Sequence, residues 1–248
     1  MSGLSEVELE TMRSVEDELW WYRALRRHVL QLLAPCSPQF DLLDAGCGSG
    51  GMLAQIRARF PKAALTGLDY SERALELTAE RQLDVALTAG STDRIPLPDN
   101  SFEVVLSLDV IVARGVDVPE ALREMQRVLR PGGRLMLNVP AFDFLRGSHD
   151  VAVGNALRYT RRQLAQLLGQ TGYTISHMTY WNMSLMPAVA AARWRSRGRA
   201  AQQAVRSDLA PLWPPLNAVL TALASGELAL SRAIPLPFGT SLFAVAQK

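Results

Sequence analysis

The stretch "DLLDAGCGSGG", residues Asp41 to Gly51, joins a short apolar run to a glycine-rich turn. The run is typical of a buried strand, and "GMLAQIRARF" directly after it is typical of a helix. Gly46, Gly48 and Gly51 match the pattern G-x-G-x-x-G, in which glycines let the backbone approach a ligand without an intervening Cβ atom. The stretch therefore predicts a ligand-binding α/β fold. It leaves open which cofactor the turn serves.

The residues beyond this turn continue to alternate between strand and helix patterns. We expect strands at residues 63–70, 84–90, 102–110, 133–140, 172–181 and 240–248, and helices at 71–82, 119–129 and 161–168. Ser71 is the expected N-cap of the first of these helices, and Thr160 with Gln163 forms an expected capping box at the last. The alternation predicts a Rossmann-like α/β fold with a seven-stranded, mostly parallel sheet and helices on both faces.

Three further segments complete the expected fold. A helix capped by Ser14 carries an apolar stripe from Val15 to Leu32 and forms an N-terminal helical cap. Residues 141–159 are expected to form a long irregular loop, a feature that often serves function. Residues 183–238 are predicted to hold two or three helices inserted before the last strand. We therefore expect one domain over residues 1–248, with a cap (1–38), a cofactor-binding core (39–182 and 239–248) and a helical insert (183–238).

Composition excludes several functional classes. The formal net charge is +2, and the basic run from Arg193 to Arg199 has only Trp194 beside it, so nucleic acid is not an expected partner. Two cysteines and three histidines offer no disulfide framework and no metal-ligand spacing, which indicates a cytoplasmic protein without a metal. "MSGLSEVELE" is not a targeting signal, and prolines interrupt the apolar stretch 209–226, so no stable membrane insertion is expected.

Asp44 decides between the two cofactors that use such a glycine turn. It ends the first strand, two residues before Gly46. A dinucleotide pyrophosphate on this turn would face the carboxylate, and that repulsion costs several kcal/mol at an effective dielectric of ~20. S-adenosylmethionine instead carries a sulfonium and an ammonium, so Asp44 becomes a partner for the ammonium. The residues therefore favour S-adenosylmethionine over NAD or NADP.

Asp69 is the second expected cofactor residue. It ends the second strand, where an acid can accept hydrogen bonds from both ribose hydroxyls. Both cofactor classes need this acid, so Asp69 indicates an adenosine without identifying the cofactor. Tyr70 beside it is a candidate for packing against the adenine ring.

Four ordered motifs, "LLDAGCGSGGMLAQI", "LTGLDYSERAL", "RIPLPDNSFEVVLSLDVI" and "ALREMQRVLRPGGRLMLNVPA", together resemble the class I S-adenosylmethionine-dependent methyltransferases. The resemblance covers residues 40–141 and is to the small-molecule branch with a ubiquinone-biosynthesis-like core. The flanks "EDELWWYRALRRHVLQLL" and "GSHDVAVGNALRYTRRQLAQLLGQTGY" resemble a subgroup with an aromatic pair on the leading helix. The resemblance implies methyl transfer to a small molecule, at oxygen or nitrogen.

The sequence departs from the family pattern at three places. Ser91 stands where relatives often have an acid that binds the adenine amino group, so Asp93 or the backbone NH of Thr92 is an alternative. Val112 and Ala113 stand where many relatives have Glu-His. Residues 154–159 lack two polar positions of the subgroup pattern. The resemblance therefore leaves the identity of the acceptor open.

The predicted site combines these residues with candidates from both flanks. The expected cofactor residues are Tyr22, Arg26, Asp44, Gly46, Cys47, Gly48, Asp69, Tyr70, Ser91, Thr92, Asp93 and Leu108. The expected acceptor residues are Trp20, Trp21, Asn155 and Arg158, and the catalytic candidates are His149, Asp150 and Tyr159. Trp20 and Trp21 lie off the apolar stripe, so either the chain or a ligand must cover them. His149 is the candidate general base, and a purely structural role of His149 and Asp150 in holding the loop stays open.

Two other functions remain as alternatives. One is an S-adenosylmethionine-binding protein that acts as a binding module or catalyses a different reaction such as cyclisation, which the missing Glu-His pair permits. The other is an NAD(P)-dependent oxidoreductase, which Asp44 disfavours. The insert is compatible with ordinary core packing, with a homodimer surface, and with an interfacial helix at residues 216–230 that receives an apolar or lipid-like substrate.

Overall fold

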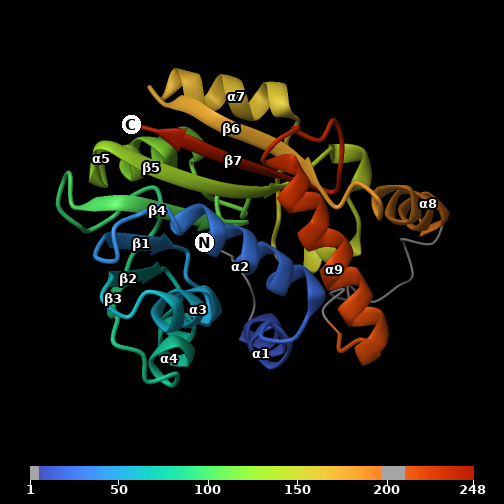
Figure 1. Cartoon of the computed structure of the whole chain (residues 1–248), viewed down its shortest axis with the longest axis horizontal. Helices are drawn as coiled ribbons and strands as arrows, with labels where there is room; N and C mark the ends of the chain where they lie inside the picture. The colour runs from blue at the N-terminus through green and yellow to red at the C-terminus, as the bar shows by residue number, and fades with distance from the viewer. Residues whose placement is uncertain (1–5, 197–209) are drawn as a thin grey trace.

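Seven strands form one sheet in the computed structural model, which describes residues 6–196 and 210–248 (Figure 1). They are β1 (Asp41–Ala45), β2 (Ala64–Asp69), β3 (Ala86–Ala89), β4 (Phe102–Leu108), β5 (Leu129–Pro140), β6 (Thr174–Trp181) and β7 (Ser241–Gln247). Their order across the sheet is β3-β2-β1-β4-β5-β7-β6. Only β7 among these strands runs against its neighbours, pairing antiparallel with both β5 and β6. The predicted seven-stranded, mostly parallel sheet is confirmed.

The helices lie before, between and after these strands. They are α1 (Glu6–Val15), α2 (Trp20–Leu33), α3 (Gly51–Arg59), α4 (Glu72–Ala79), α5 (Val118–Val128), α6 (Ser148–Ala152), α7 (Arg161–Gln170), α8 (Met186–Ser196) and α9 (Pro214–Ser231), with a 3-10 turn η1 at Asp143–Leu145. Two predicted caps are confirmed. The Ser71 hydroxyl accepts from the Ala74 amide at α4, and Thr160 forms the capping box with Gln163 at α7.

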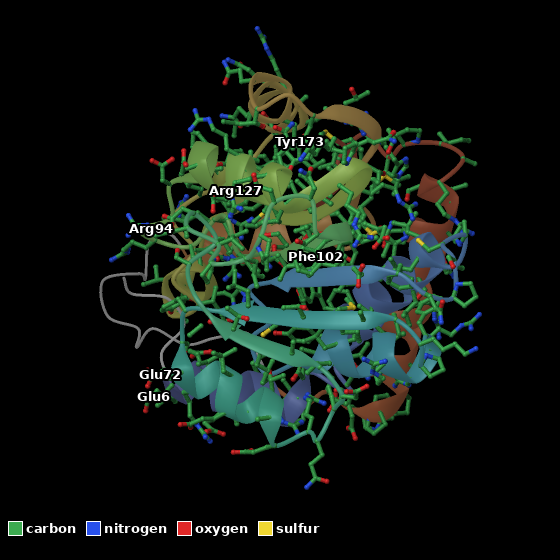
Figure 2. All side chains as sticks on the ribbon, turned by 90° about the vertical axis from the view of Figure 1, so that its left-hand side faces the viewer. Glu6, Glu72, Arg94, Phe102, Arg127 and Tyr173 are labelled. Atoms are coloured by element: carbon green, nitrogen blue, oxygen red, sulfur yellow. The ribbon has the colours of Figure 1, made fainter. Side chains whose placement is uncertain are left out.

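Helices cover both faces of the sheet. On one face α2, α3 and α9 pack against Leu42, and on the other α5 and α7 pack against the core that contains Leu43. These neighbouring strand residues point to opposite faces, as the two-residue period of a strand requires. In Figure 2, Phe102 of β4 lies between Arg127 and Tyr173 on one side and Glu6 and Glu72 on the other. The carboxyl ends of β1, β2 and β4 meet at one edge, which is where ligands bind in such sheets.

The N-terminal segment differs from the predicted single helix. Ser14 is not an N-cap, because its hydroxyl donates to the Thr11 carbonyl at 2.7 Å near the end of α1. The chain turns at residues 16–19, and α2 begins at Trp20 without a side-chain cap. The apolar residues keep a helical spacing across this turn, so the sequence pattern predicted one helix where the structure has two. Residues 141–159 also differ from the expected irregular loop, since they contain η1 and α6.

The insert contributes α8 and α9, which lie at the right-hand end of the sheet in Figure 1. α9 packs alongside α2 on the same face of the sheet. The predicted arginine run extends beyond α8, so Arg197 and Arg199 lie outside the described residues. No helix within residues 6–196 and 210–248 is long and apolar enough to cross a membrane.

Candidate functional site

The glycine turn between β1 and α3 leaves no room for side chains. Gly46, Gly48 and Gly50 all have positive φ angles, of 95°, 54° and 76°, in a region that glycine occupies without strain. A Cβ atom on Gly46 would lie 2.3 Å from Cγ2 of Val110, which follows β4. The amides of Gly46 and Cys47 donate to the Leu68 carbonyl, at 2.7 and 2.9 Å. The turn is therefore fixed against β2 and packed against the end of β4.

Two predicted acids lie on either side of this turn. Asp69 accepts from the amides of Gly48 and Ser71, both at 2.9 Å. Burial raises the pKa of Asp69, while these backbone donors lower it in part. Asp44 is 2% exposed, and burial together with the charges of Asp69 and Glu16 raises its pKa to about 7. Arg26 opposes that shift. Asp44 is thus a buried carboxyl that a cationic ligand would ionise.

Asp109, at the end of β4, is a third acid that sequence reasoning missed in favour of its neighbour Leu108. Its φ of 61° lies in the left-handed region, uncommon for a residue other than glycine. Asn138 donates to its carboxylate at 2.9 Å and accepts from the Trp181 indole at 2.9 Å. Burial raises the pKa of Asp109 to about 7. The signal was available, because Asp109 follows its strand as Asp44 and Asp69 end theirs.

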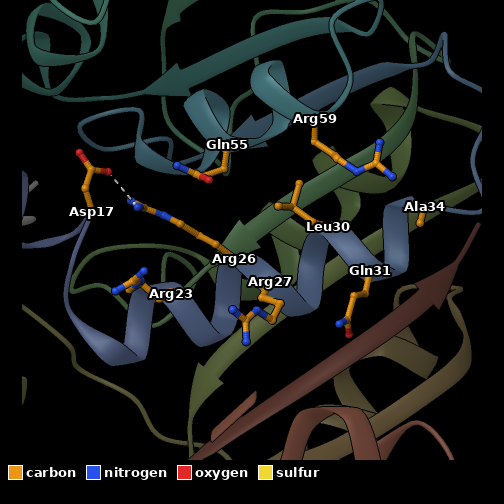
Figure 3. Close-up of a pocket in the computed structure, with 9 residues that line it drawn as sticks. All are labelled: Asp17, Arg23, Arg26, Arg27, Leu30, Gln31, Ala34, Gln55 and Arg59. Carbon is orange, nitrogen blue, oxygen red and sulfur yellow. Dashed lines mark hydrogen bonds and ion pairs between the residues drawn. The ribbon is translucent and has the colours of Figure 1, made fainter. Parts of the chain in front are cut away.

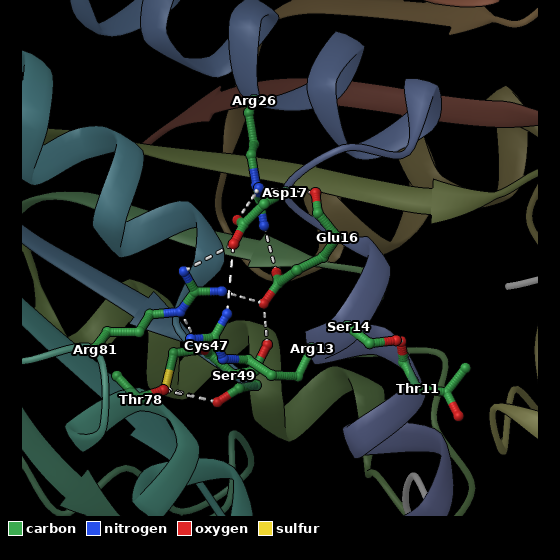
Figure 4. Close-up of polar contacts among 11 residues, drawn as sticks. Thr11, Arg13, Ser14, Glu16, Asp17, Arg26, Cys47, Ser49, Thr78 and Arg81 are labelled. Atoms are coloured by element: carbon green, nitrogen blue, oxygen red, sulfur yellow. Dashed lines mark hydrogen bonds and ion pairs between the residues drawn. The ribbon is translucent and has the colours of Figure 1, made fainter. Parts of the chain in front are cut away.

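A buried ionic network joins the N-terminal segment to the glycine turn (Figure 4). Glu16 accepts from Arg26, from Arg81 and from the Ser49 hydroxyl. Arg26 also donates to Asp17 at 2.9 Å, and Arg81 donates to the Ser49 carbonyl at 2.6 Å. Arg26 was predicted from sequence, but the network was not, since it joins the turn before α2 to Ser49 before α3 and Arg81 after α4. The network fastens the turn between α1 and α2 over the start of α3.

The aromatic residues of α2 pack mainly on the protein. Trp21 stacks on the fully buried Trp181, with centroids 5.5 Å apart, and meets Tyr22 edge to face at 5.0 Å. Burial and the nearby acids Glu16 and Asp109 raise the pKa of Tyr22 above its usual range. The Trp20 amide donates to Asn217 of α9 at 2.8 Å. Tyr22 therefore faces the acidic edge, and a substrate role for Trp20 and Trp21 stays a prediction.

The adenine side of the predicted site follows β3. Thr92 is buried, and its hydroxyl has no hydrogen-bond partner in the described residues. Asp93 accepts from the Asp117 amide at 3.3 Å, and Ser91 forms a bridge with Arg94. Tyr70 is 41% exposed at the end of β2. Among these candidates, only Thr92 presents a buried, unsatisfied polar atom.

The loop after β5 brings four predicted residues together. The fully buried Asp150 forms a two-point ion pair with Arg158, at 2.9 and 3.0 Å, and accepts from the Gly147 amide at 2.8 Å. The Asn155 amide donates to the Asp150 carbonyl, and Tyr159 is 8% exposed against the core. This pairing supports a structural role for Asp150, while the role of His149 as a base stays a prediction. The Arg158–Asp150 pair also acts electrostatically on Asp109, which links the loop to the acidic edge.

A basic cleft of about 440 Å³ lies apart from this edge, between α2 and α3 (Figure 3). Arg23, Arg27 and Arg59 line it with the already paired Arg26. None of the predicted acids at the strand ends lines this cleft. The acidic residues of the candidate site therefore lie at the carboxyl edge of the sheet, and the cleft is a separate basic surface.

The carboxyl edge fits S-adenosylmethionine. Asp44, Asp69 and Asp109 place three carboxyl groups at this edge, which favours a cationic ligand and disfavours a pyrophosphate. Gly46 provides a place where any side chain would collide with Val110. The unsatisfied Thr92 hydroxyl offers a polar contact on the side expected for adenine.

Comparison with known proteins gives the same assignment. Residues 43–137 match the family model Methyltransf_11, described as a methyltransferase domain. A malonyl-[acyl-carrier protein] O-methyltransferase from Dechloromonas aromatica is 33% identical over 168 residues, covering 63% of this chain and 62% of the relative. A trans-aconitate 2-methyltransferase from Deinococcus radiodurans is 33% identical over 146 residues, covering 58% of this chain and 52% of the relative. The chain thus spans less than two thirds of the length of these relatives.

Solved structures agree at the level of the fold. A geranyl diphosphate methyltransferase in complex with S-adenosylmethionine superposes with a TM-score of 0.61 at 17% identity, covering 91% of this chain and 85% of that one. Residues 43–137 therefore match a methyltransferase domain, and the relatives in sequence and in fold are methyltransferases, among them enzymes that use S-adenosylmethionine.

Proposed function

We propose that this chain transfers the methyl group of S-adenosylmethionine to a small-molecule acceptor, at an oxygen or a nitrogen atom. The observation that carries the proposal is the group of acids around the glycine turn, above all the buried Asp44. A carboxylate in this position attracts a ligand with a sulfonium and an ammonium. It repels the diphosphate of a dinucleotide.

The residues of the edge take separate roles in this proposal. Bound S-adenosylmethionine supplies a methyl group on a positively charged sulfur. Asp44 binds the ammonium, and Asp69 accepts from the ribose hydroxyls with lone pairs left over from the Gly48 and Ser71 amides. Gly46 keeps the backbone close to the ligand, and Thr92 contributes its free hydroxyl on the adenine side.

The acceptor side is formed by residues 141–159 together with the aromatic residues of α2. The Arg158–Asp150 ion pair holds this loop at the end of β5, close enough to Asp109 for their charges to interact. Methyl transfer relies mainly on positioning, so a base is needed only where the acceptor must lose a proton. His149 is the residue proposed to take that proton. One relative is named an O-methyltransferase, which supports oxygen as an acceptor atom.

Calorimetry with S-adenosylmethionine, S-adenosylhomocysteine and NAD tests the cofactor part. We expect binding of the first two in preference to NAD. Asp69→Ala is expected to lose about 10- to 150-fold in affinity, since a carboxylate hydrogen bond contributes about 1.5–3 kcal/mol. Tighter binding of NAD would refute the proposal. Unchanged affinity in the variant would remove Asp69 from the site.

Incubation with labelled S-adenosylmethionine and a small-molecule extract, followed by mass spectrometry of the labelled product, tests the reaction. A methylated product identifies both the acceptor and the atom. Tight cofactor binding without any methylated product would instead favour the non-methylating alternative. Val112 and Ala113, which replace a polar pair common in relatives, are the observation that keeps this alternative in view.

A further inference from the structure

The helix α9 carries its bulky aliphatic residues on the side that faces away from the sheet. Leu216, Val219, Leu223 and Leu230 are 44–55% exposed, at spacings that place them on one side of the helix. The opposite side buries Asn217, Thr221, Ala224, Leu228 and Ser231. A surface helix of a globular protein usually has the reverse arrangement, with apolar residues inside.

Hydrogen bonds fix α9 in this orientation. The Asn217 side chain accepts from the Trp20 amide and donates to the Glu18 carbonyl, both at 2.8 Å. Within α9, the Thr221 hydroxyl donates to the Asn217 carbonyl at 2.7 Å and the Ser231 hydroxyl to the Leu228 carbonyl at 2.8 Å, so the polar groups on the buried side are satisfied by the helix itself. Rotating the helix to bury its aliphatic side would break the contacts of Asn217. The outward apolar side is therefore a built feature of the fold.

Exposed apolar residues continue beyond the helix. Of the 14 large hydrophobic side chains exposed in the described residues, nine lie between residues 194 and 238. Trp213 at the start of α9 is 71% exposed, and Trp194 on α8 is 74% exposed. We call the outward side of α9, with Trp213, Leu216, Val219, Leu223, Leu230 and Ile234, the apolar face. Exposed apolar surfaces of this kind mark interaction sites.

The charges around the apolar face are mainly basic. The described residues 183–196 and 210–238 contain three arginines, Arg193, Arg195 and Arg232, and one acid, Glu227. Glu227 is engaged by the amides of Met183 and Ser184. Arg195 stands exposed beside Trp194, and Arg232 stands exposed at the end of α9. An apolar face with exposed arginines beside it favours a partner that is both apolar and anionic.

We propose that the apolar face docks on the surface of an anionic lipid bilayer. Aliphatic side chains would enter the boundary between headgroups and acyl chains, tryptophans would lie at the headgroup level, and arginines would meet lipid phosphates. The described helices cannot span a bilayer, so the contact lies in its plane. A second copy of the chain fits less well, because a twofold interface would bring the two arginine-rich inserts together.

The proposal stands apart from the proposed reaction, because it concerns a surface rather than the carboxyl edge. Cosedimentation of the full chain with vesicles, without cofactor or acceptor, therefore tests it whether or not methyl transfer is found. Vesicles of phosphatidylcholine with phosphatidylglycerol are compared with phosphatidylcholine alone, at low and high salt. Light scattering of the same samples without lipid reports the oligomeric state.

Val219→Glu is the informative variant and Val7→Glu its matched control. Val219 lies on the apolar face at 55% exposure, and Val7 lies on α1 at 73% exposure, so both changes add the same charge at an exposed valine. Val219→Glu is expected to lose about tenfold or more in binding to anionic vesicles, and Val7→Glu to bind as the unaltered chain does. Arg195→Ser is expected to weaken binding and its salt dependence.

The outcomes separate the possible occupants. Binding to anionic vesicles that falls with salt and with Val219→Glu, but not with Val7→Glu, supports the proposal. Equal binding to neutral vesicles, or no binding to either, overturns it. A dimer that Val219→Glu converts to a monomer, without vesicle binding, would assign the face to a second copy. Thermal melting of both variants checks that each is folded.

Discussion

Asp44 is the residue where the charge of the site depends most on pH. Its pKa of about 7 lies above the unfolded value of 3.8, so the folded chain without ligand holds a proton that the unfolded chain releases. The contribution of Asp44 to folding stability is therefore lost as pH rises from 3.8 through about 7. A bound ammonium reverses this preference because it favours the ionised form.

We therefore predict that affinity for S-adenosylmethionine rises with pH up to about 7 and then levels off. One coupled proton changes affinity by at most about tenfold per pH unit below that value. Calorimetry between pH 5.5 and 8.5 measures the slope. Asp44→Asn is expected to bind more weakly and to lose most of the dependence. A dependence that persists unchanged in this variant would assign it to Asp109 instead, whose pKa is also about 7.

His149 offers a second test at the scale of a single residue. If it is the base, His149→Ala should lower the methylation rate by about 10²–10⁴-fold at unchanged cofactor affinity, with partial rescue at high pH. Steady-state rates and calorimetry on the same samples separate this from a structural role. A loss of thermal stability at unchanged turnover would show that His149 only supports the loop.

Single residues also mark where sequence reasoning stopped. Asp44 and Asp69 were predictable from local sequence, because each lies at the end of a strand, two residues before Gly46 and Ser71 respectively. Glu16, Ser49 and Arg81 were not, since their contact joins residues 33 and 65 positions apart along the chain. Asp109 lay between these cases and was overlooked although its position resembled that of the other two acids.

At the scale of elements, the turn between α1 and α2 is held by charge rather than by apolar packing. Glu16 is buried between Arg26 and Arg81, with side-chain exposures of 5%, 7% and 8%. The predicted continuous helix failed here, because hydrophobic period alone does not report a turn stabilised by distant arginines. The caps of α4 and α7 were predicted correctly, because their donors and acceptors lie within three residues.

We predict that Glu16→Ala destabilises the fold by about 3–5 kcal/mol, because it removes the buried carboxylate that Arg26 and Arg81 share and leaves them the more exposed Asp17. Glu18→Ala, at an exposed position in the same turn, is the control and should change stability by less than about 0.5 kcal/mol. Urea unfolding followed by circular dichroism gives both values. Equal, small effects of the two variants would mean that the network contributes little.

At the scale of the molecule, the two faces of the sheet share the same strands. Leu42 belongs to the core under α2 and α3, and Leu43 to the core under α5 and α7. If either core unfolded, it would expose one face of the strands whose other face forms the second core. Residues 1–30 include Leu25 and Val29 of the first core, so removing them would affect folding as well as the site. The division into cap, core and insert at residues 38, 182 and 238 remains a proposal.

We predict that heat unfolds the chain in one cooperative transition. Tryptophan fluorescence reports mainly Trp20, Trp21 and Trp181 on one face, while far-ultraviolet circular dichroism reports all elements. The two melting curves should coincide. Two separated transitions would indicate that the faces, or the insert, unfold independently.

The position of β7 in the sheet affects how the chain folds during its synthesis. β7 lies between β5 and β6 in the sheet but is synthesised after both. While the insert is translated, the edges of β5 and β6 that will pair with β7 therefore have no hydrogen-bond partner strand. Until β7 leaves the ribosome, the nascent chain exposes the unpaired edges of β5 and β6, which other chains can join. Chaperone demand should therefore fall once residues 241–247 are free to pair with both strands.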